Sequence, residues 1–284
     1  MMDHRPESER MKLALAVQTP EVDRPIPVAL LSGTWDEKLA KAAALGVDGL
    51  ELMTADPAAL DAAGMRAGLE QHGLAVAAVG SGALAFATGL TLLHAERQKA
   101  ALARERLRQM IAFAAAVGAP LVTVGSLRGR LANAGAGARE ELAQALREAA
   151  AYAQTHSVRL ALEPLNRYES DVVNTVEQGL EFLQEVGHPA LGLVLDTYHI
   201  NIEERSWTEP FRRAAAAGRL LHVHLGDNNR LPPGQGLIDF RAIVATLTEI
   251  GYNRFLSAEL LARPDPDTAA RATVEAMKPL LREK

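Results

Sequence analysis

Four short apolar runs in the second half of the chain each lead into a residue that can bind a metal or move a proton. The first run, from Val158 to Leu162, stops at Glu163, and a proline follows at once. Such a run is typical of a strand buried on both faces, and the proline cannot continue its hydrogen-bonded ladder. Three further runs downstream lead to Asp196, to the pair His222 and His224, and to Glu259. The pattern therefore places a polar group at the end of each of four buried strands.

Strand-like and helix-like segments alternate along all 284 residues. Besides the four runs above, strands are expected at Lys12–Val17, Val47–Met53, Leu74–Gly80 and Pro120–Gly125. Amphipathic helices are expected at Trp35–Leu45, Pro57–His72, Ala95–Val117, Arg139–His156, Thr175–Val186, Glu209–Ala217, Phe240–Ile250 and Pro266–Arg282. Alternation of this kind implies parallel strands joined by right-handed crossovers. Eight units predict an α/β fold, a single (β/α)8 TIM barrel at residues 11–284, whose catalytic groups lie at the C-terminal strand ends.

Several other segments are expected to be irregular. Residues 1–10 form a polar leader that we expect to be disordered, and residues 18–32 are a proline-rich loop with a short extended piece at Val28–Leu31. A loop rich in Gly, Ser and Ala runs on to Leu93, and SLRGRLANAGAGA, beginning at Ser126, is predicted to be a flexible loop.

Composition excludes several classes of function. The chain has no cysteine, so a disulfide framework, a thiolate metal site and a cysteine nucleophile are all impossible. A net charge of -5 argues against a nucleic-acid partner, and no apolar stretch is long enough for a membrane span. The polar start carries no apolar signal segment. These features favour a cytoplasmic protein that acts on a small molecule.

The strand-end residues Glu163, Asp196, His224 and Glu259 are the candidate metal ligands. Three carboxylates with one imidazole suit a divalent cation. Each residue taken alone could be a helix cap or one half of an ion pair. A buried charge needs a counter-charge or a metal, however, and four such positions in succession favour the metal.

Other polar residues lie at or near the expected mouth. His222 shares a strand face with His224 but lies one layer deeper, so a supporting role for it and plain packing both stay open. Glu51 has the inward parity of a site residue and is a weak second candidate for support. His199 follows Asp196 in a loop, within reach of a substrate above the metal.

Charged residues in the loops have ordinary alternatives. Glu169 could bind a ligand or pair with Arg167. Arg230, in the turn-rich loop GDNNRLPPGQG, could be a solvated loop residue. Arg128 and Arg130 could bind a phosphate, although the favoured interpretation is that neither of them binds a ligand.

Together these motifs resemble a known family. LEPLNRYES, LDTYHINIEE, HVHLGDNNRLPPGQG and SAEL are similar to the motifs of sugar isomerases and epimerases among the xylose isomerase-like TIM barrels. The ketose 3-epimerases, such as those of D-tagatose and D-psicose, are the most similar branch. The resemblance is strong from Leu160 to Leu260 and only architectural before that.

The resemblance implies a carbohydrate isomerase with one divalent ion, manganese first and Co²⁺, Mg²⁺ or Zn²⁺ as alternatives. It implies that Glu163, Asp196, His224 and Glu259 hold the ion, and that the two glutamates also act as the acid/base pair, passing a proton through an enediolate. The same resemblance implies that Glu169, His199 and Arg230 contact a sugar or sugar phosphate, and that the protein is a dimer or tetramer.

Other functions on the same fold stay open from the sequence. Aldose–ketose isomerases, hydroxypyruvate isomerases and inosose dehydratase-like lyases use a similar metal. Endonuclease IV-like nucleases share a DTxH-type motif. They need a trinuclear zinc cluster with further histidines, whereas His72 and His94 here do not lie at strand ends and the net charge is negative, so the sequence argues against this remote alternative.

Overall fold

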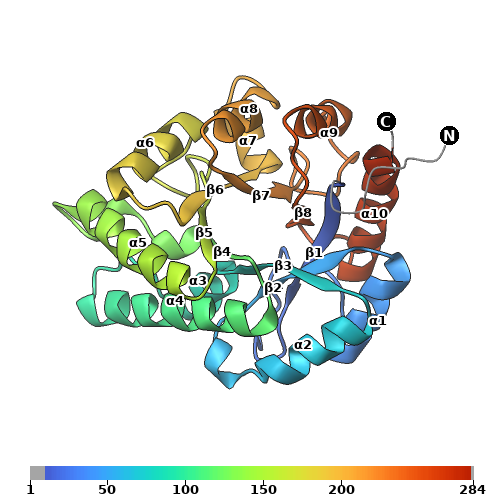
Figure 1. Cartoon of the computed structure of the whole chain (residues 1–284), viewed down its shortest axis with the longest axis horizontal. Helices are drawn as coiled ribbons and strands as arrows, with labels where there is room; N and C mark the ends of the chain where they lie inside the picture. Colours follow the sequence, from blue (N-terminus) through green and yellow to red (C-terminus); the bar gives the residue numbers. More distant parts are fainter. Residues whose placement is uncertain (1–9, 283–284) are drawn as a thin grey trace.

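The computed structural model describes residues 10–282, and within them eight parallel strands close into a barrel in chain order (Figure 1). The strands are β1 (Lys12–Gln18), β2 (Gly49–Met53), β3 (Ala75–Gly80), β4 (Leu121–Val124), β5 (Arg159–Leu162), β6 (Leu191–Asp196), β7 (Leu220–Leu225) and β8 (Phe255–Ala258). The prediction of a single (β/α)8 TIM barrel is confirmed. Apart from Arg10, the expected polar leader lies outside the described residues.

Helices surround the barrel (Figure 1), and α3 and α7 among them carry residues that face its mouth. They are α1 (Trp35–Leu45), α2 (Ala62–Gln71), α3 (Gly82–Thr88), α4 (Arg97–Val117), α5 (Ala138–Thr155), α6 (Val176–Val186), α7 (Thr197–Glu203), α8 (Glu209–Ala216), α9 (Phe240–Glu249) and α10 (Pro266–Arg282). Short 3₁₀ turns are η2 (Pro57–Ala59), η3 (Ser126–Arg128) and η4 (Leu131–Asn133). Among the described residues, no helix is both long and apolar enough to cross a membrane.

Local signals explain where several helices begin and end. Thr34 and Glu37 form a capping box at the start of α1, and Thr175 with Gln178 forms one at the start of α6. Helix α1 ends at Gly46, whose φ of 66° is left-handed, a conformation that glycine adopts without a steric penalty.

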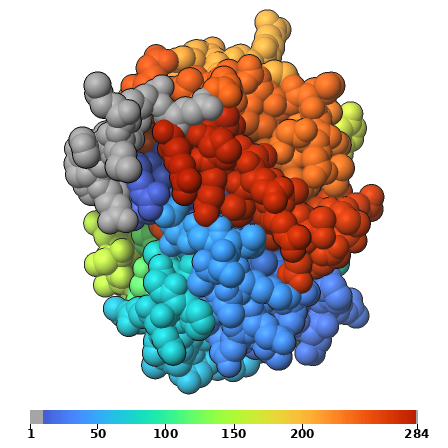
Figure 2. Space-filling view, turned by 90° about the vertical axis from the view of Figure 1, so that its right-hand side faces the viewer, coloured from blue at the N-terminus to red at the C-terminus, as the bar shows by residue number. Residues whose placement is uncertain are grey.

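The first and last strands complete the barrel. Lys12 to Leu15 of β1 pair in parallel with Phe255 to Ala258 of β8. Figure 2 shows the C-terminal segment packed against N-terminal parts of the chain. Residues far apart in the sequence thereby form one continuous wall around the mouth.

Four expectations about local structure are wrong. Helix α3 forms in the expected Gly/Ser/Ala loop, because Ala83 and Leu84 can be buried against the barrel. The expected helix at Pro57–His72 is divided into η2 and α2. The expected extended piece at residues 28–31 is interrupted, because Val28 lies in a turn and Leu31 has a left-handed φ of 65°, although Leu30 N–H donates to Ala16 O at 2.7 Å.

The fourth concerns the expected flexible loop after β4, which contains two 3₁₀ turns. Leu131 N–H and Ala132 N–H donate to the carboxylate of Asp171 at 2.8 and 3.0 Å. Since Asp171 lies about 40 residues further along the chain, no local signal revealed this anchor.

Candidate active site

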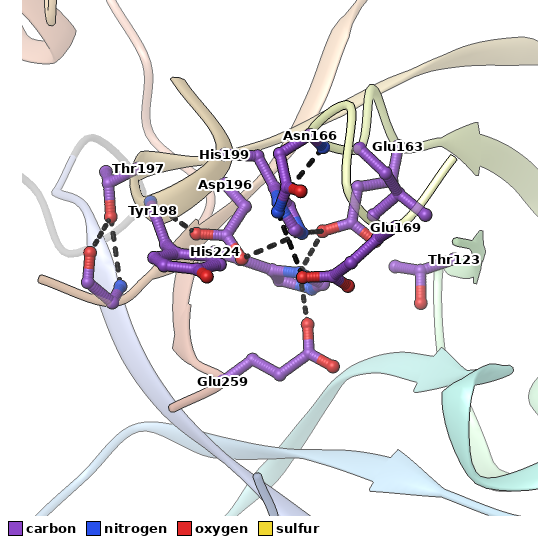
Figure 3. A network of polar contacts seen from close by, with 12 residues as sticks. Thr123, Glu163, Asn166, Glu169, Asp196, Thr197, Tyr198, His199, His224 and Glu259 are labelled. Atoms are coloured by element: carbon purple, nitrogen blue, oxygen red, sulfur yellow. Dashed lines mark hydrogen bonds and ion pairs between the residues drawn. The ribbon is translucent and has the colours of Figure 1, made fainter. Parts of the chain in front are cut away.

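The four candidate ligands meet at the C-terminal mouth of the barrel (Figure 3). Glu163 directly follows β5, Asp196 ends β6, His224 lies in β7 and Glu259 directly follows β8. Backbone pairing puts Asp196 beside His224. One ligand atom from each of the four lies within 4.8 Å of the others. The strand-end pattern thus brings together the side chains that the sequence singled out.

His224 is the centre of this cluster. Its Nδ1 lies 2.8 Å from Glu259 Oε2 and 3.2 Å from Glu163 Oε1. Burial disfavours the charged imidazolium, but Glu51 and Glu259 outweigh that effect and raise the pKa of His224 well above its ordinary value. Without a cation, the ring is therefore a buried positive charge that neutralises the carboxylates around it.

Asp196 has two oxygens in different situations. Oδ1 accepts a hydrogen bond from Tyr198 N–H at 2.8 Å, so the residue caps helix α7. Oδ2 is buried and has no hydrogen-bond partner. Burial, reinforced by the nearby charge of Glu163, raises the pKa of Asp196 to about 7. The second oxygen is therefore available to a ligand.

These features fit a divalent cation. Buried polar atoms normally have partners, so the lone Oδ2 of Asp196 needs one. Burial is the largest effect on Glu163 and raises its pKa, and the nearby charge of Glu259 acts in the same direction. Three carboxylate oxygens and one imidazole nitrogen are a donor set used by Mn²⁺ and similar ions.

His199 lies in helix α7 rather than in the expected loop, and it faces the cluster. Its Nδ1 accepts hydrogen bonds from Asn166 N–H at 3.3 Å and Asn166 Nδ2 at 2.8 Å. That leaves Nε2 as the protonated nitrogen, 3.8 Å from Asp196 Oδ2 and without a partner. Burial lowers the pKa of His199 well below its ordinary value. His199 is thus a neutral donor that points toward the cluster.

Arg230 and Glu169 lie together at the rim of the site. Arg230 Nη1 is 3.3 Å from Glu169 Oε1, and its guanidinium lies 4.9 Å from the ring centre of Tyr198. Its Nε is buried and has no partner. Arg230 is therefore not a solvated loop-tip residue.

The loop that carries Arg230 is held by Asp227, which the sequence interpretation did not single out. Asp227 Oδ2 accepts hydrogen bonds from Gly234 N–H and Gly236 N–H at 3.0 and 2.9 Å, and Oδ1 accepts one from Ile238 N–H at 3.1 Å. An Asp among Asn, Pro and Gly residues is a known turn signal, so this anchor could have been found.

The alternative prediction for Glu169, an ion pair with Arg167, is wrong. Arg167 pairs with Glu203, at 2.9 Å between Nε and Oε1, whereas Glu169 accepts a hydrogen bond from Asn166 Nδ2 at 2.9 Å. Asn166 therefore positions both Glu169 and His199.

The two arginines after β4 differ in role. Arg128 is fully buried and donates to the backbone oxygens of Glu163 and Val173, and burial lowers its pKa to about 10. It connects the backbone at Glu163 with the backbone at Val173, and its donors are already bonded within the protein and not available to a phosphate. Arg130 donates to Tyr168 O at 2.6 Å and lines the mouth.

Glu51 and His222 lie directly below His224. Glu51 Oε2 is 3.1 Å from His224 Nε2 and 3.0 Å from His222 Nε2. His222 Nε2 is also 2.9 Å from Ser257 Oγ. These residues therefore contact the cluster from inside the barrel.

A cavity of about 490 Å³ opens beside the cluster. Glu169, Arg230 and Glu259 line one side. The other side comes from loops of the first half of the chain, with Ile26, Val28, Met53, Phe86, Thr91 and Arg130. A volume in the range of about 300–1,000 Å³ is typical of small-molecule sites.

Comparison with known proteins adds independent findings. Residues 39–280 match the family model described as xylose isomerase-like TIM barrel. The chain is 33% identical over 231 residues to L-ribulose 3-epimerase of Mesorhizobium japonicum, which covers 79% of this chain and 74% of that protein.

Two further relatives carry related names. The chain is 40% identical to D-psicose 3-epimerase of Enterocloster bolteae over 116 residues, which covers 41% of this chain and only 38% of that protein. A crystal structure of D-allulose 3-epimerase from Methylomonas sp., in complex with D-allulose, is similar with a TM-score of 0.77 and 26% identity, covering 97% of this chain and 98% of that one.

Proposed function

Because the chain belongs to the xylose isomerase-like TIM-barrel family, we propose that it is a carbohydrate isomerase that inverts carbon 3 of a ketose with one divalent metal ion. The observation that carries this proposal is the meeting of Glu163 and Glu259 at Nδ1 of His224. Similarity to ketose 3-epimerases along most of the chain supports the same reaction.

The ion would be held by Glu163, Asp196, His224 and Glu259. When bound, it supplies Lewis acidity that stabilises negative charge on the oxygen beside the reacting carbon. The buried Oδ2 of Asp196 gives such an ion a ligand atom that has no hydrogen-bond partner among the described residues.

Glu163 and Glu259 would exchange the proton of carbon 3. A base must lie within hydrogen-bonding reach of the proton it removes, and two bases on different sides of the carbon permit inversion. These two residues come from β5 and β8, with the strands of Asp196 and His224 between them. Burial raises the pKa of Glu163, whereas for Glu259 burial is outweighed by His224 and the pKa lies below its ordinary value. The two groups therefore differ in proton affinity, as an acid and a base should.

His199 and Arg230 would hold the sugar in place. The unpartnered Nε2–H of His199 can donate to a substrate oxygen near Asp196, and the unpartnered Nε–H of Arg230 can donate to another. Glu169, fixed by Asn166, can accept from a hydroxyl group. The adjoining cavity takes the rest of the substrate, with Phe86 at its rim.

The nuclease alternative receives no support from the geometry. Within residues 10–282, the groups of side chains that could hold a cation are Glu163–Asp196–His224–Glu259 and Glu51–His222–His224, and both use His224. A cluster of three zinc ions needs more ligands than these residues provide.

Manganese as the ion, assembly into a dimer or tetramer and a cytoplasmic location belong to the same proposal. The donor set supports manganese over a soft metal. Metal analysis of the purified protein and its mass in solution measure the first two, and fluorescent tagging in cells measures the third.

The decisive experiment follows the proton. Mn²⁺-loaded protein is incubated with D-psicose or L-ribulose in D₂O, and deuterium in the product is located by NMR. We expect label at carbon 3. Label at carbon 1 or 2 without carbon 3 would identify an aldose–ketose isomerase, and loss of water would identify a lyase.

Matched variants assign the two bases. Glu163→Gln and Glu259→Gln should each abolish net epimerisation, and Glu249→Gln, on the surface beside Arg212, should keep full activity. Metal content is measured on each sample, because both glutamates are candidate ligands. Normal turnover by either active-site variant, with metal bound, would exclude that residue as a base.

A further inference from the structure

A buried carboxylate lies on the far side of His224 from the proposed metal site. Glu51 belongs to β2, across the barrel from β7, and only 2% of its surface is exposed. Its carboxylate is 3.1–3.2 Å from Nε2 of His224 through both oxygens. Burying such a charge is costly, so its presence at this depth calls for an explanation.

Three neighbouring groups fix the carboxylate of Glu51. Besides His224, His222 Nε2 lies 3.0 Å from Oε2, and Thr123 Oγ1 donates to Oε1 at 3.3 Å. Carboxylate oxygens at these distances accept hydrogen bonds, so each imidazole nitrogen that faces them carries a proton.

That requirement determines the state of His224. With a proton kept on Nε2, the ring must give up its other proton to bind a cation, and its free electron pair is then on Nδ1, the nitrogen that faces Glu163 and Glu259. We propose that Glu51 is a positioning residue for the metal site, which holds His224 in the tautomer and orientation that present Nδ1 to the cation. His222 in turn holds Glu51, and Ser257 lies 2.9 Å from the same nitrogen of His222.

This inference depends on the metal site of the proposed function but not on the sugar reaction. If the protein acted on another substrate, the support of His224 by Glu51 would be unchanged. Each test below therefore measures metal binding in the absence of any sugar.

The first test requires no variant. The protein is labelled with ¹⁵N in its eight histidines and loaded with diamagnetic Zn²⁺, and NMR identifies which ring nitrogen of each histidine binds metal. We expect Nδ1 of His224 to bind zinc while Nε2 carries a proton. Coordination through Nε2 would overturn the proposal.

The second test replaces the carboxylate. Glu51→Gln preserves the size of the side chain, but an amide has one acceptor oxygen and turns its NH₂ group toward one of the two histidines. Loss of such a supporting partner typically weakens metal affinity by about 10–100-fold. Titration calorimetry of metal-free protein with Mn²⁺ should show a loss in this range.

Glu249→Gln is the matched control, because it makes the same chemical change on the surface, beside Arg212. It leaves the contacts between Glu51 and the two histidines in place. We expect its affinity for Mn²⁺ to stay close to that of the wild type. Equal affinity in the wild type and Glu51→Gln, with both proteins folded by circular dichroism, would overturn the proposal.

The stoichiometry of the same titration tests a different role for Glu51. Glu51, His222 and His224 also lie close enough together to hold a cation of their own. One ion per chain agrees with a positioning role. Two ions per chain, reduced to one in Glu51→Gln, would make Glu51 a metal ligand instead.

Discussion

Metal affinity should depend on pH through Asp196. Burial and the nearby charge of Glu163 raise the pKa of Asp196 to about 7, so in the metal-free protein this carboxyl is largely protonated in mild acid. A carboxyl must lose its proton before it can bind a cation, so protons and metal compete for the site. Affinity for the metal therefore rises with pH, through a window centred near the pKa of Asp196.

The size of the effect follows from that pKa. A group with a pKa of about 7 is ionised in about one molecule of eleven at pH 6 and in about ten of eleven at pH 8. Proton release from Asp196 alone should thus strengthen apparent metal binding about tenfold between pH 6 and pH 8. The raised pKa values of Glu163 and His224 act in the same direction, so tenfold is a lower bound.

Titration calorimetry with Mn²⁺ at pH 6, 7 and 8, in buffers that do not bind manganese, measures this dependence. Proton release is checked by repeating one titration in buffers with different ionisation enthalpies. Asp196→Asn should bind manganese weakly at every pH and with a shallower slope. Equal affinity of the wild type at pH 6 and pH 8 would refute the argument, and wild-type affinity in Asp196→Asn would place the site elsewhere.

Three further variants test other parts of the site. Arg230→Lys should lower kcat/KM by roughly 10–100-fold in steady-state assays, because an ammonium cannot replace the planar guanidinium, and normal turnover would contradict a substrate contact. Gly125→Ala would place a Cβ 2.4 Å from Glu163 Oε2 and force that oxygen to move, so calorimetry should show weaker Mn²⁺ binding; unchanged binding would contradict the need for Glu163 to keep this position. Arg128→Met leaves the buried carbonyl oxygen of Glu163 without its donor, whereas Val173 O keeps the hydrogen bond from Leu165 N–H. The change should lower the free energy of unfolding by about 1–3 kcal/mol, measured by urea denaturation of metal-free protein, and an unchanged midpoint would contradict this link.

The features that could be predicted from sequence are those encoded by local periodicity. Glu163 and Glu259 directly follow buried apolar runs, Asp196 ends one, and His224 is the last residue but one of another; all strands of a parallel barrel point the same way. Strand-end positions such as Glu163 and Glu259 must therefore share one mouth. The fold and the candidate metal cluster both follow from this rule.

What could not be predicted depends on contacts between distant residues. Arg230 and Glu169 are in contact although they are 61 positions apart in the sequence, and Arg167 pairs with Glu203, 36 positions away. The partner of Glu169 could therefore be identified only from the fold. Helix α3 was missed because glycine and serine signals outweighed a short run of alanine and leucine. The role of Asn166 was missed because it depends on the position of His199.

The wall of the cavity has a consequence for how such a protein changes over generations. The candidate metal ligands of the protein all come from β5 to β8. The opposite side of the cavity is formed by the segments that follow β1 to β4, which carry Phe86 and Arg130. Mutations on that side can alter which molecules fit without touching the atoms that carry out the reaction. Proteins related by descent can therefore differ in substrate specificity while they catalyse the same reaction. A mutant library restricted to these loops is the direct way to select for activity on a new sugar.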